Sequence, residues 1–390
     1  MSYIKRYFSI ELPKKQSAFV WGARKTGKTT YLKHTFPKAL FYDLLQSDVA
    51  LTLAKAPHIF REELLKYKDT NTNRLVVVDE VQKVPGLMDE IHWLIENTEF
   101  QFILCGSSAR QMKRHGVNIL GGRAWKYHFF PLCFPELQEF DLLRIFNHGT
   151  LPSHYLSDHY NKSLRAYLDD YLMLEIQAAG IVRNLPAFAR FVDALRFSHG
   201  EMLNYSNISR QAGIDAKTVK EYFQILVDTL IGYIILPYRK KVSRDIISET
   251  PKFYLFDVGV ASLIKHHKFN ELKGSDAGHA LEHYIFTELI AYKHLSELDF
   301  EINYWRTKDK LEVDFILNEG EVAIEVKISD VISPSELKGL RAFHQEHKPK
   351  KSILVCQVPR ARRMIEGDLT LDILPVKDFL QALWAGEIVS

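Results

Sequence analysis

A chain of 390 residues is too long for one hydrophobic core of ordinary size, so two or three domains are expected. Its 46% hydrophobic and 25% charged residues are typical of a soluble globular protein. Basic and acidic residues number 51 and 48, and the net charge of +3 neither favours nor excludes nucleic acid as a partner. The three distant cysteines form no disulfide or metal-binding pattern, and neither a signal segment nor a membrane-spanning apolar run is present. We therefore expect a cytoplasmic protein with no membrane partner.

A phosphate-binding loop of the form G-x-x-x-x-G-K-[ST] occupies residues 22–29. A predicted strand at residues 18–21 precedes it and a predicted helix at 28–33 follows, which is the context that the motif requires. Lys28 is expected to bind the β- and γ-phosphates, and the Thr29 hydroxyl is expected to bind magnesium. The predicted nucleotide-binding residues are Gly22, Ala23, Arg24, Lys25, Thr26, Gly27, Lys28, Thr29 and Thr30.

An acidic pair follows the next strong strand signal. After a strand at residues 39–44 and a helix at 59–68, the β-branched run 74–78 has no exposed face, which favours a central strand of a parallel sheet. Asp79 is expected to support magnesium through water, and Glu80 to orient or deprotonate the attacking water. A loop start or helix cap is the plainer interpretation, but the preceding phosphate loop favours the catalytic one.

Further candidate catalytic residues follow two later strands. The buried strand at residues 101–106 ends in Ser107 and Ser108, and hydroxyls at this edge of an α/β sheet face the ligand crevice. Ser107 could therefore sense the γ-phosphate, although a helix cap would coexist with this role. Arg123, just before the strand at 125–129, is a candidate arginine finger that acts in the same chain or from a neighbouring subunit. A solvated surface arginine explains it at least as well.

The middle of the chain is predicted to be mainly helical. Apolar residues recur at helical spacing over 164–172 and 187–197. Residues 205–226 then read as a helix, a turn containing Gly213, the N-capping Asp215 and a second helix, which is a helix-turn-helix pattern.

A β-rich segment at residues 231–238 and the basic run 239–241 complete a winged-helix outline. Lys217 and Lys220 would lie on the exposed face of the second helix, where they could contact DNA. Packing or oligomerisation is an equally good alternative, because helix-turn-helix outlines alone are not specific for DNA.

The C-terminal part is predicted to contain a strand at 253–257, a helix at 278–289 and a hairpin formed by 311–317 and 322–327. If the hairpin is symmetric about Glu319 and Gly320, paired residue numbers sum to 639.

In that register Asp314 faces Glu325, with Cβ atoms ~5 Å apart. Two facing carboxylates destabilise a sheet unless a cation joins them, and Lys327 shares their face. Lys327 would also face Glu312, so a plain cross-strand ion pair is the alternative.

Five motifs are found along the first part of the chain: Gly22…Lys28-Thr29 and residues 76–82, 106–110, 121–123 and 130–136. Together they resemble a large prokaryotic family of AAA-like P-loop ATPases with a C-terminal domain of unknown function and nuclease-like fold. The resemblance implies ATP as the nucleotide, the additional-strand sheet order of AAA+ relatives, and Glu80 as the water-orienting carboxylate. A homo-oligomer is a further expectation.

The C-terminal hairpin resembles the PD-(D/E)xK nuclease superfamily, with Val313 in place of the usual proline. This resemblance implies that Asp314 and Glu325 bind magnesium or manganese, that Lys327 assists the attacking water, and that Glu282 is the helix acid. Members that keep the fold without activity leave nuclease function open.

The sequence thus predicts an α/β protein with three parts: a P-loop parallel-sheet ATPase domain (1–150), a helical winged-helix domain (151–250) and an α/β restriction-endonuclease-like domain (251–390). The predicted activity is magnesium-dependent ATP hydrolysis. Nucleotide state would control either DNA cleavage or, in the alternative, a switch or scaffold that binds DNA or another partner without cutting. The candidate catalytic residues are Lys28, Glu80, Ser107, Arg123 and Lys327, and the candidate metal ligands are Thr29, Asp79, Glu282, Asp314 and Glu325.

Overall fold

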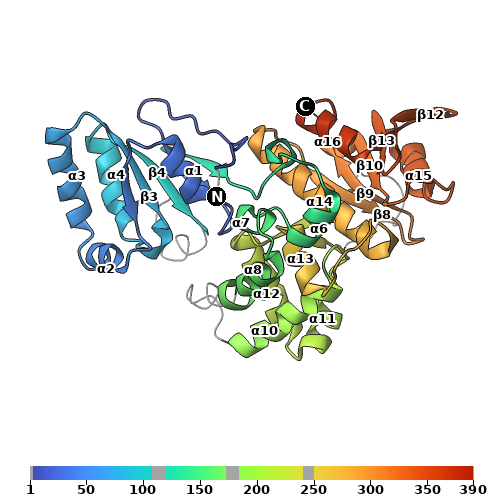
Figure 1. Ribbon diagram of the computed structural model, residues 1–390, viewed down its shortest axis with the longest axis horizontal. Helices are drawn as coiled ribbons and strands as arrows, with labels where there is room; N and C mark the ends of the chain where they lie inside the picture. The colour runs from blue at the N-terminus through green and yellow to red at the C-terminus, as the bar shows by residue number, and fades with distance from the viewer. Residues whose placement is uncertain (1–2, 108–119, 173–183, 240–249, 390) are drawn as a thin grey trace. The chain divides into compact units, whose positions relative to one another are not determined.

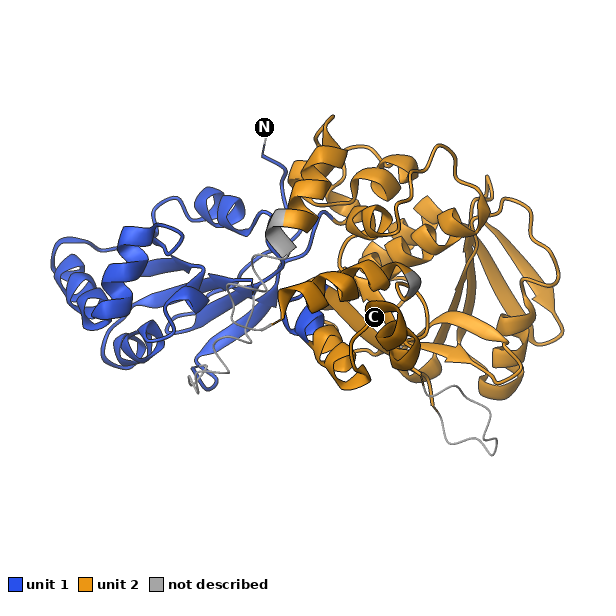
Figure 2. Cartoon of the chain, turned by 90° about the horizontal axis from the view of Figure 1, so that it is seen from below, with its two compact units in different colours: residues 1–132, 225–231 blue, residues 133–224, 232–390 orange. Residues whose placement is uncertain are grey.

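The computed structural model describes residues 3–107, 120–172, 184–239 and 250–389 (Figure 1). The chain divides into two compact units, shown in different colours in Figure 2. The first unit comprises residues 1–132 and 225–231, and the second comprises residues 133–224 and 232–390.

The first unit is built on a five-stranded parallel sheet, and the strand order is β2-β3-β4-β1-β5. The strands are β1 (Ser17–Trp21), β2 (Leu40–Asp43), β3 (Leu75–Asp79), β4 (Gln101–Gly106) and β5 (Ala124–His128). The helices are α1 (Lys28–Thr35), α2 (Ser47–Lys55), α3 (His58–Thr70) and α4 (Leu87–Asn97), with a 3₁₀ turn at Val81–Lys83. This confirms the predicted parallel sheet.

Helices α3 and α4 lie side by side and cover part of the sheet (Figure 1). Phe60 of α3 and Ile91 of α4 pack in one buried cluster with Val76 and Phe102. Burial on both sides explains the continuous apolar run of β3, because a strand in a covered parallel sheet has no solvent face.

Strand β4 pairs with β3 on one side and with β1 on the other. This is the additional-strand order that the family resemblance implied. Since all strands run in the same direction, the carboxyl end of β4 lies between the phosphate loop after β1 and the acidic pair at the end of β3.

The second unit begins with helices. They are α6 (Leu142–His148), α7 (Pro152–Tyr155), α8 (Tyr160–Ala166) with a π-helical turn at Tyr167–Leu172, α10 (Leu185–Ala194), α11 (Tyr205–Ala212) and α12 (Ala216–Asp228), whose last residues belong to the first unit. The predicted helix-turn-helix is confirmed locally. Gly213 ends α11 in the left-handed region with φ 63°, and Asp215 Oδ1 accepts a hydrogen bond of 2.9 Å from the Thr218 amide.

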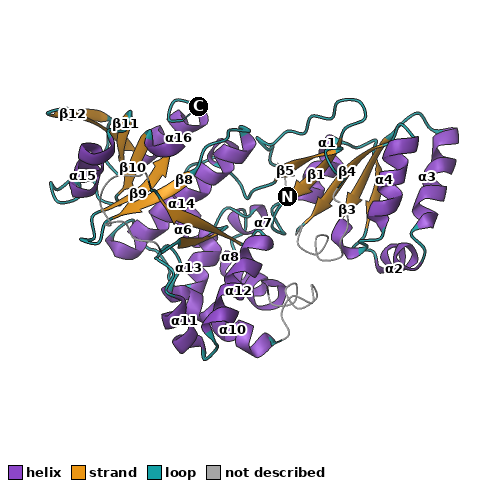
Figure 3. Ribbon diagram, turned by 180° about the vertical axis from the view of Figure 1, so that it is seen from behind, coloured by secondary structure: helices purple, strands orange, loops and turns teal. Residues whose placement is uncertain are grey.

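An eight-stranded mixed sheet forms the rest of the second unit (Figure 3), in the order β12-β13-β11-β10-β9-β8-β6-β7. Its strands are β6 (Gly232–Pro237), β7 (Lys252–Leu255), β8 (Ile302–Arg306), β9 (Glu312–Leu317), β10 (Val322–Val326), β11 (Lys351–Cys356), β12 (Arg362–Glu366) and β13 (Leu369–Pro375). Strand β6, which was expected to belong to the winged helix, pairs antiparallel with β7 and parallel with β8 of the predicted C-terminal domain. One sheet therefore extends across residue 250, where the sequence predicted a domain boundary.

The helices of this part are α13 (Val258–Ile264), α14 (Gly274–Leu295), α15 (Lys338–His347) and α16 (Val376–Trp384). Helix α14 packs through Phe286, which stacks on Tyr254 with ring centroids 4.4 Å apart. Helix α15 packs through Phe343 against Trp305, with ring centroids 5.5 Å apart. No helix in the described ranges is both long and apolar enough to cross a membrane.

A buried carboxylate, Glu288 of α14, ties three segments of the second unit together. Its oxygens accept hydrogen bonds from the Phe134 amide at 3.0 and 3.1 Å and from Trp384 Nε1 at 2.7 Å. Burial raises the pKa of Glu288 to about 7, and these hydrogen bonds oppose the shift without cancelling it. The folded state therefore binds a proton at Glu288 more tightly than the unfolded chain does.

We predict that replacing Glu288 removes part of the pH dependence of stability. A carboxyl whose pKa is raised on folding stabilises the folded state at low pH, and this contribution is lost as the pH rises through about 7. Between pH 5 and pH 8 the wild type should lose about 2–3 kcal/mol of unfolding free energy that Glu288→Gln does not lose. Urea unfolding at both pH values measures this difference, with the exposed Glu271→Gln as a control. Identical pH dependence of Glu288→Gln and wild type would contradict it.

Candidate functional site

The phosphate loop has the backbone geometry that its glycines permit. Gly27 precedes α1 with φ 97°, a conformation that a side chain would strain. Lys28 is buried, and its ammonium donates hydrogen bonds to the carbonyls of Gly22 at 2.7 Å and Ala23 at 3.0 Å. The side chain is thereby held inside the curve of the loop, where a phosphate group would bind.

Two contacts outside the motif fix this loop in place. Arg6 donates from Nη1 to the Thr26 carbonyl and from Nη2 to the Phe130 carbonyl, both at 2.7 Å. A Cβ on Gly22 would lie 2.2 Å from the Phe129 carbonyl oxygen, so only glycine allows this close approach. The sequence analysis missed Arg6, because it lies in the N-terminal segment and belongs to no motif.

The two predicted magnesium ligands of the nucleotide site are in contact. Thr29 Oγ1 donates a hydrogen bond of 2.5 Å to Asp79 Oδ2, while Asp79 Oδ1 accepts from the Glu80 amide at 3.1 Å. Both residues offer oxygen atoms, which magnesium prefers, and they meet at the carboxyl edge of the sheet, Thr29 from α1 and Asp79 from the end of β3. The donor set therefore fits magnesium bound together with nucleotide phosphates.

Glu80 and Ser107 are brought together by Gln82, a residue that the sequence analysis did not single out. Glu80 adopts a left-handed backbone with φ 57° and is buried. Its Oε1 lies 3.6 Å from Arg24 Nε of the phosphate loop. The Gln82 amide nitrogen lies 2.5 Å from Glu80 Oε2 and 3.1 Å from Ser107 Oγ. The water-orienting and γ-phosphate-sensing candidates thus share one hydrogen-bonded group.

Arg123 is not brought to the phosphate loop. Its carbonyl accepts a hydrogen bond from the amide of Ser17, the first residue of β1, and its guanidinium pairs with Glu96. The loop follows Trp21 at the other end of β1, so the whole length of this strand separates the two. An arginine finger from the same chain does not fit this position, which leaves a finger that acts on a neighbouring subunit or a plain surface arginine. Ser108, Arg110, Lys240 and Lys241 lie outside the described residues.

The register of the C-terminal hairpin is confirmed. Val322 pairs with Leu317, Ala323 with Ile316 and Ile324 with Phe315, so every pair sums to 639. Continuing this register brings Asp314 opposite Glu325.

Both of these carboxylates are buried. Asp314 Oδ2 accepts from the Val326 amide at 2.8 Å, and Lys327 forms an ion pair with Glu325. Asp314, Glu325 and Lys327 are therefore arranged in the hairpin as the PD-(D/E)xK resemblance implies.

Two further acids, Glu282 and Glu312, are neutralised by the buried Lys252, and we call these three residues together with Asp314, Glu325 and Lys327 the C-terminal cluster. Lys252 Nζ of β7 lies 3.2 Å from Glu282 Oε1 and 2.5 Å from Glu312 Oε1. Glu312 Oε2 also accepts from Arg306 at 2.6 Å, and Tyr254 donates to Glu282. Glu312 thus has its own cationic partners, whereas Lys327 is engaged by Glu325.

Lys252 could not be predicted from the sequence, because it is a single lysine outside any motif. Its neighbours in the cluster come from α14, β8 and β9, which only the folded sheet brings together.

The electrostatics of the cluster reflect carboxylates that share a buried space. Burial, followed by the charge of Glu282, raises the pKa of Asp314 to about 7. Burial and the charge of Asp314 raise the pKa of Glu325 well above its usual range. Burial opposes the charged form of Lys252, but Glu282 and its other acidic neighbours raise the pKa of this lysine overall.

The fit of this cluster to a metal ion is mixed. Glu325 Oε2 is buried and has no hydrogen-bond partner among the described residues, which is the state of an oxygen that could bind a cation. Glu282, by contrast, is already engaged by Lys252 and Tyr254. In the described ranges, no three His, Cys, Asp or Glu side chains form a group that could hold a metal ion as they stand.

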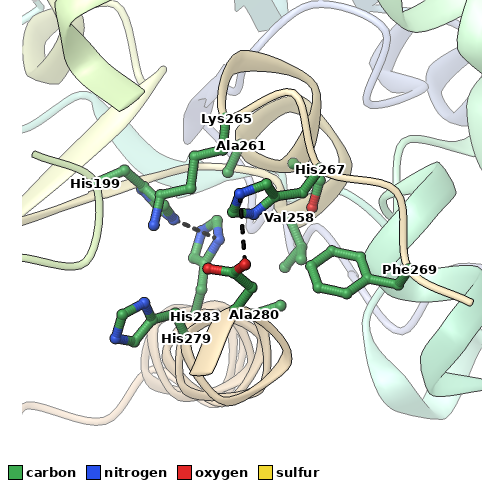
Figure 4. Close-up of a pocket in the computed structure, with 11 residues that line it drawn as sticks. His199, Val258, Ala261, Lys265, His267, Phe269, His279, Ala280 and His283 are labelled. Carbon is green, nitrogen blue, oxygen red and sulfur yellow. Dashed lines mark hydrogen bonds and ion pairs between the residues drawn. The ribbon is translucent and has the colours of Figure 1, made fainter. Parts of the chain in front are cut away.

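A separate histidine-lined pocket lies between α13 and α14 (Figure 4). The Leu255 amide donates to His199 Nδ1 at 3.2 Å, His199 Nε2 and His283 Nδ1 are 3.0 Å apart, and His283 Nε2 lies 2.6 Å from the Leu255 carbonyl. All three hydrogen bonds can form when each ring carries one proton. Burial also lowers the pKa of both histidines. Both rings are therefore neutral structural groups.

Three family models match consecutive parts of the chain. Residues 14–138 match an AAA domain, residues 139–269 match a domain of unknown function, and residues 277–379 match another domain of unknown function. An uncharacterized protein of Haemophilus influenzae is 20% identical over 323 residues, which cover 78% of this chain and 76% of that protein.

Two solved structures also align with this chain. The Aeropyrum pernix Orc1 protein in complex with DNA is 14% identical, with a TM-score of 0.29 over 66% of this chain and 88% of its own. A signal transduction ATPase with numerous domains and a tetratricopeptide repeat sensor, from Pyrococcus horikoshii, is 13% identical, with a TM-score of 0.19 over 76% of this chain and 52% of its own. These TM-scores are too low to support a structural argument. Residues 14–138 thus match an AAA domain in sequence and have the loop geometry of a P-loop ATPase.

We predict that the C-terminal cluster depends on Lys252 for stability. Lys252→Met would leave Glu282 and Glu312 with less compensation in a buried environment, which should lower the unfolding free energy by about 3–5 kcal/mol. The control Arg363→Met breaks an exposed ion pair with Asp372 and should cost about 0–1 kcal/mol. Urea unfolding measures both. Equal effects of the two substitutions would show that Lys252 is not needed to compensate the acids.

Proposed function

We propose that this protein binds and hydrolyses ATP at the carboxyl edge of the five-stranded sheet. The observation that carries the proposal is the contact of Thr29 with Asp79, within a unit whose residues 14–138 match an AAA domain. A phosphate loop and an acidic strand end at hydrogen-bond distance are the two halves of a nucleotide-hydrolysing site.

Each residue has a distinct role in this proposal. Lys28 and the loop amides bind the phosphates, and Ser107 contacts the γ-phosphate. Glu80 orients the attacking water and accepts its proton. Thr29 and Asp79 would hold magnesium, which when bound neutralises charge on the phosphate oxygens. Arg123, if it acts, does so from a neighbouring subunit in a homo-oligomer.

We predict that Lys28→Ala lowers ATP turnover by about 100-fold or more, because it removes the charge that stabilises the developing negative charge on the phosphates. Lys33→Ala, at an exposed position of the same helix, should retain wild-type turnover. Release of inorganic phosphate in the presence of magnesium measures both. Unchanged turnover in Lys28→Ala would contradict the proposal.

For the output of this activity we propose that nucleotide state controls a C-terminal DNA nuclease. The facing pair Asp314 and Glu325, with Lys327 beside them, supports this proposal. Asp314 and the unpartnered Glu325 Oε2 would hold magnesium or manganese, which when bound supplies an activated water. Lys327 would hold the water beside the scissile phosphate.

The alternative is a nucleotide-controlled switch or scaffold that binds a partner without cutting. The engagement of Glu282 by Lys252 favours it, since the helix acid is already compensated. Lys217 and Lys220 on α12 and Arg239 after β6 are exposed and would contact DNA phosphates in either case. We also propose that the protein is cytoplasmic.

We predict that Asp314→Asn abolishes cleavage of supercoiled plasmid and of single-stranded DNA, measured with magnesium or manganese and with or without ATP. The exposed Asp330→Asn is the matched control and should cut like the wild type. Absence of cutting by the wild type under all conditions, with ATP turnover intact, would exclude the nuclease and support the switch.

A further inference from the structure

Gln82 lies between two candidate catalytic residues of the nucleotide site and is the last residue of the segment 76–82, in which no individual role was assigned to it. It lies on the 3₁₀ turn that follows Glu80 and is only 5% exposed. Its Nε2 lies 2.5 Å from Glu80 Oε2 and 3.1 Å from Ser107 Oγ. A side-chain amide nitrogen carries two protons, and these two contacts use both of them. The amide therefore links a carboxylate at the end of β3 to a hydroxyl at the end of β4.

The neighbouring strand end leaves room for this amide. A Cβ on Gly106 would lie 2.3 Å from Gln82 Oε1 and 2.8 Å from a ring carbon of Trp21. Neither distance is tolerated between nonbonded heavy atoms, so glycine at residue 106 is required if Gln82 is to keep its position. The close packing of Gly106, Trp21 and Gln82 is independent of the hydrogen bonds and fixes the same side chain.

Glu80 is held on its other side by the phosphate loop. Arg24 Nε lies 3.6 Å from Glu80 Oε1, the oxygen that Gln82 does not contact. The left-handed backbone of Glu80 costs of order 1 kcal/mol, which the surrounding contacts must offset. Glu80 Oε1 thus faces the phosphate loop, and Glu80 Oε2 faces Gln82, which also contacts Ser107. The loop and Ser107 are both expected to contact bound nucleotide.

We propose that Gln82 is a positioning residue that couples the γ-phosphate contact of Ser107 to the water-orienting carboxylate of Glu80. The proposal rests on the ATPase function proposed above. A hydroxyl can donate and accept at once, so Ser107 can donate its proton to a γ-phosphate oxygen while its Oγ accepts from Gln82. The second Gln82 proton goes to Glu80 Oε2, while Oε1, on the side that faces Arg24, is the oxygen that would accept the proton of the attacking water. Phosphate, hydroxyl, amide and carboxylate are then linked by consecutive hydrogen bonds, so that the position of Ser107 on the γ-phosphate fixes the position of the Glu80 carboxylate.

This coupling predicts a separation of binding from turnover. The hydrogen bonds of Gln82 go to Glu80 and Ser107 rather than to the phosphate loop. Gln82→Met, which keeps the approximate volume but removes the donors, should therefore change ATP affinity by less than about threefold. The turnover number should fall by about 10- to 100-fold, part of the roughly 10²–10⁴ that a positioned general base contributes. Gln101→Met is the control, because Gln101 begins the same strand β4 and its amide bonds the Pro13 and Gln16 carbonyls instead.

A double-mutant cycle distinguishes coupling from a structural effect. If Gln82 acts through Ser107, then Ser107→Ala combined with Gln82→Met should lower turnover no further than the more damaging single change does. Gly106→Ala should reproduce the loss of turnover in Gln82→Met, because its Cβ would displace the amide. Thermal unfolding of each variant checks that the fold is intact.

Two outcomes would overturn the coupling. The first is wild-type turnover in a folded Gln82→Met, and the second is a strictly additive cycle with Ser107→Ala. Both are judged against Lys28→Ala measured in parallel. If Lys28→Ala also retains turnover, the ATPase proposal itself fails, whereas a loss in Lys28→Ala alone overturns only the role of Gln82.

Discussion

The insertion of β4 between β1 and β3 is the constraint on which the nucleotide site depends. Because the sheet is parallel, it brings three strand ends to one edge: the phosphate loop, the Asp79–Glu80 pair and Ser107. Without β4 in this place, Ser107 could not share the Gln82 amide with Glu80. The fold therefore assembles the site by strand order, and short side-chain hydrogen bonds complete it.

The second unit faces a different problem, which is the burial of several carboxylates in one sheet. Like charges at this spacing are unfavourable unless cations or protons compensate them. Lys252 and Arg306 compensate Glu282 and Glu312, whereas Asp314 and Glu325 hold protons more tightly than usual. The cluster is thus already part-neutralised by lysine and arginine.

The sequence predicted what depends on local patterns and on spacing. The parallel sheet, the helix-turn-helix with its Asp215 cap, and the hairpin register about Glu319 and Gly320 all follow from short-range signals, and the structure has them. Residues that act through tertiary contact carried no such signal. Arg6 and Lys252 are basic residues outside any motif, and only the folded chain brings each of them to its site. Arg123 shows the reverse case, since a glycine-rich context suggested a finger but strand direction separates it from the phosphate loop.

The central claim is that Glu80 activates water for hydrolysis of ATP bound by the phosphate loop. The most direct measurement is ATP affinity by calorimetry together with turnover by phosphate release, for wild type and Glu80→Gln. An amide at residue 80 keeps the shape of the side chain but cannot accept the proton of water. The account predicts unchanged ATP affinity with turnover reduced by about 100-fold or more. Wild-type turnover in Glu80→Gln would contradict it.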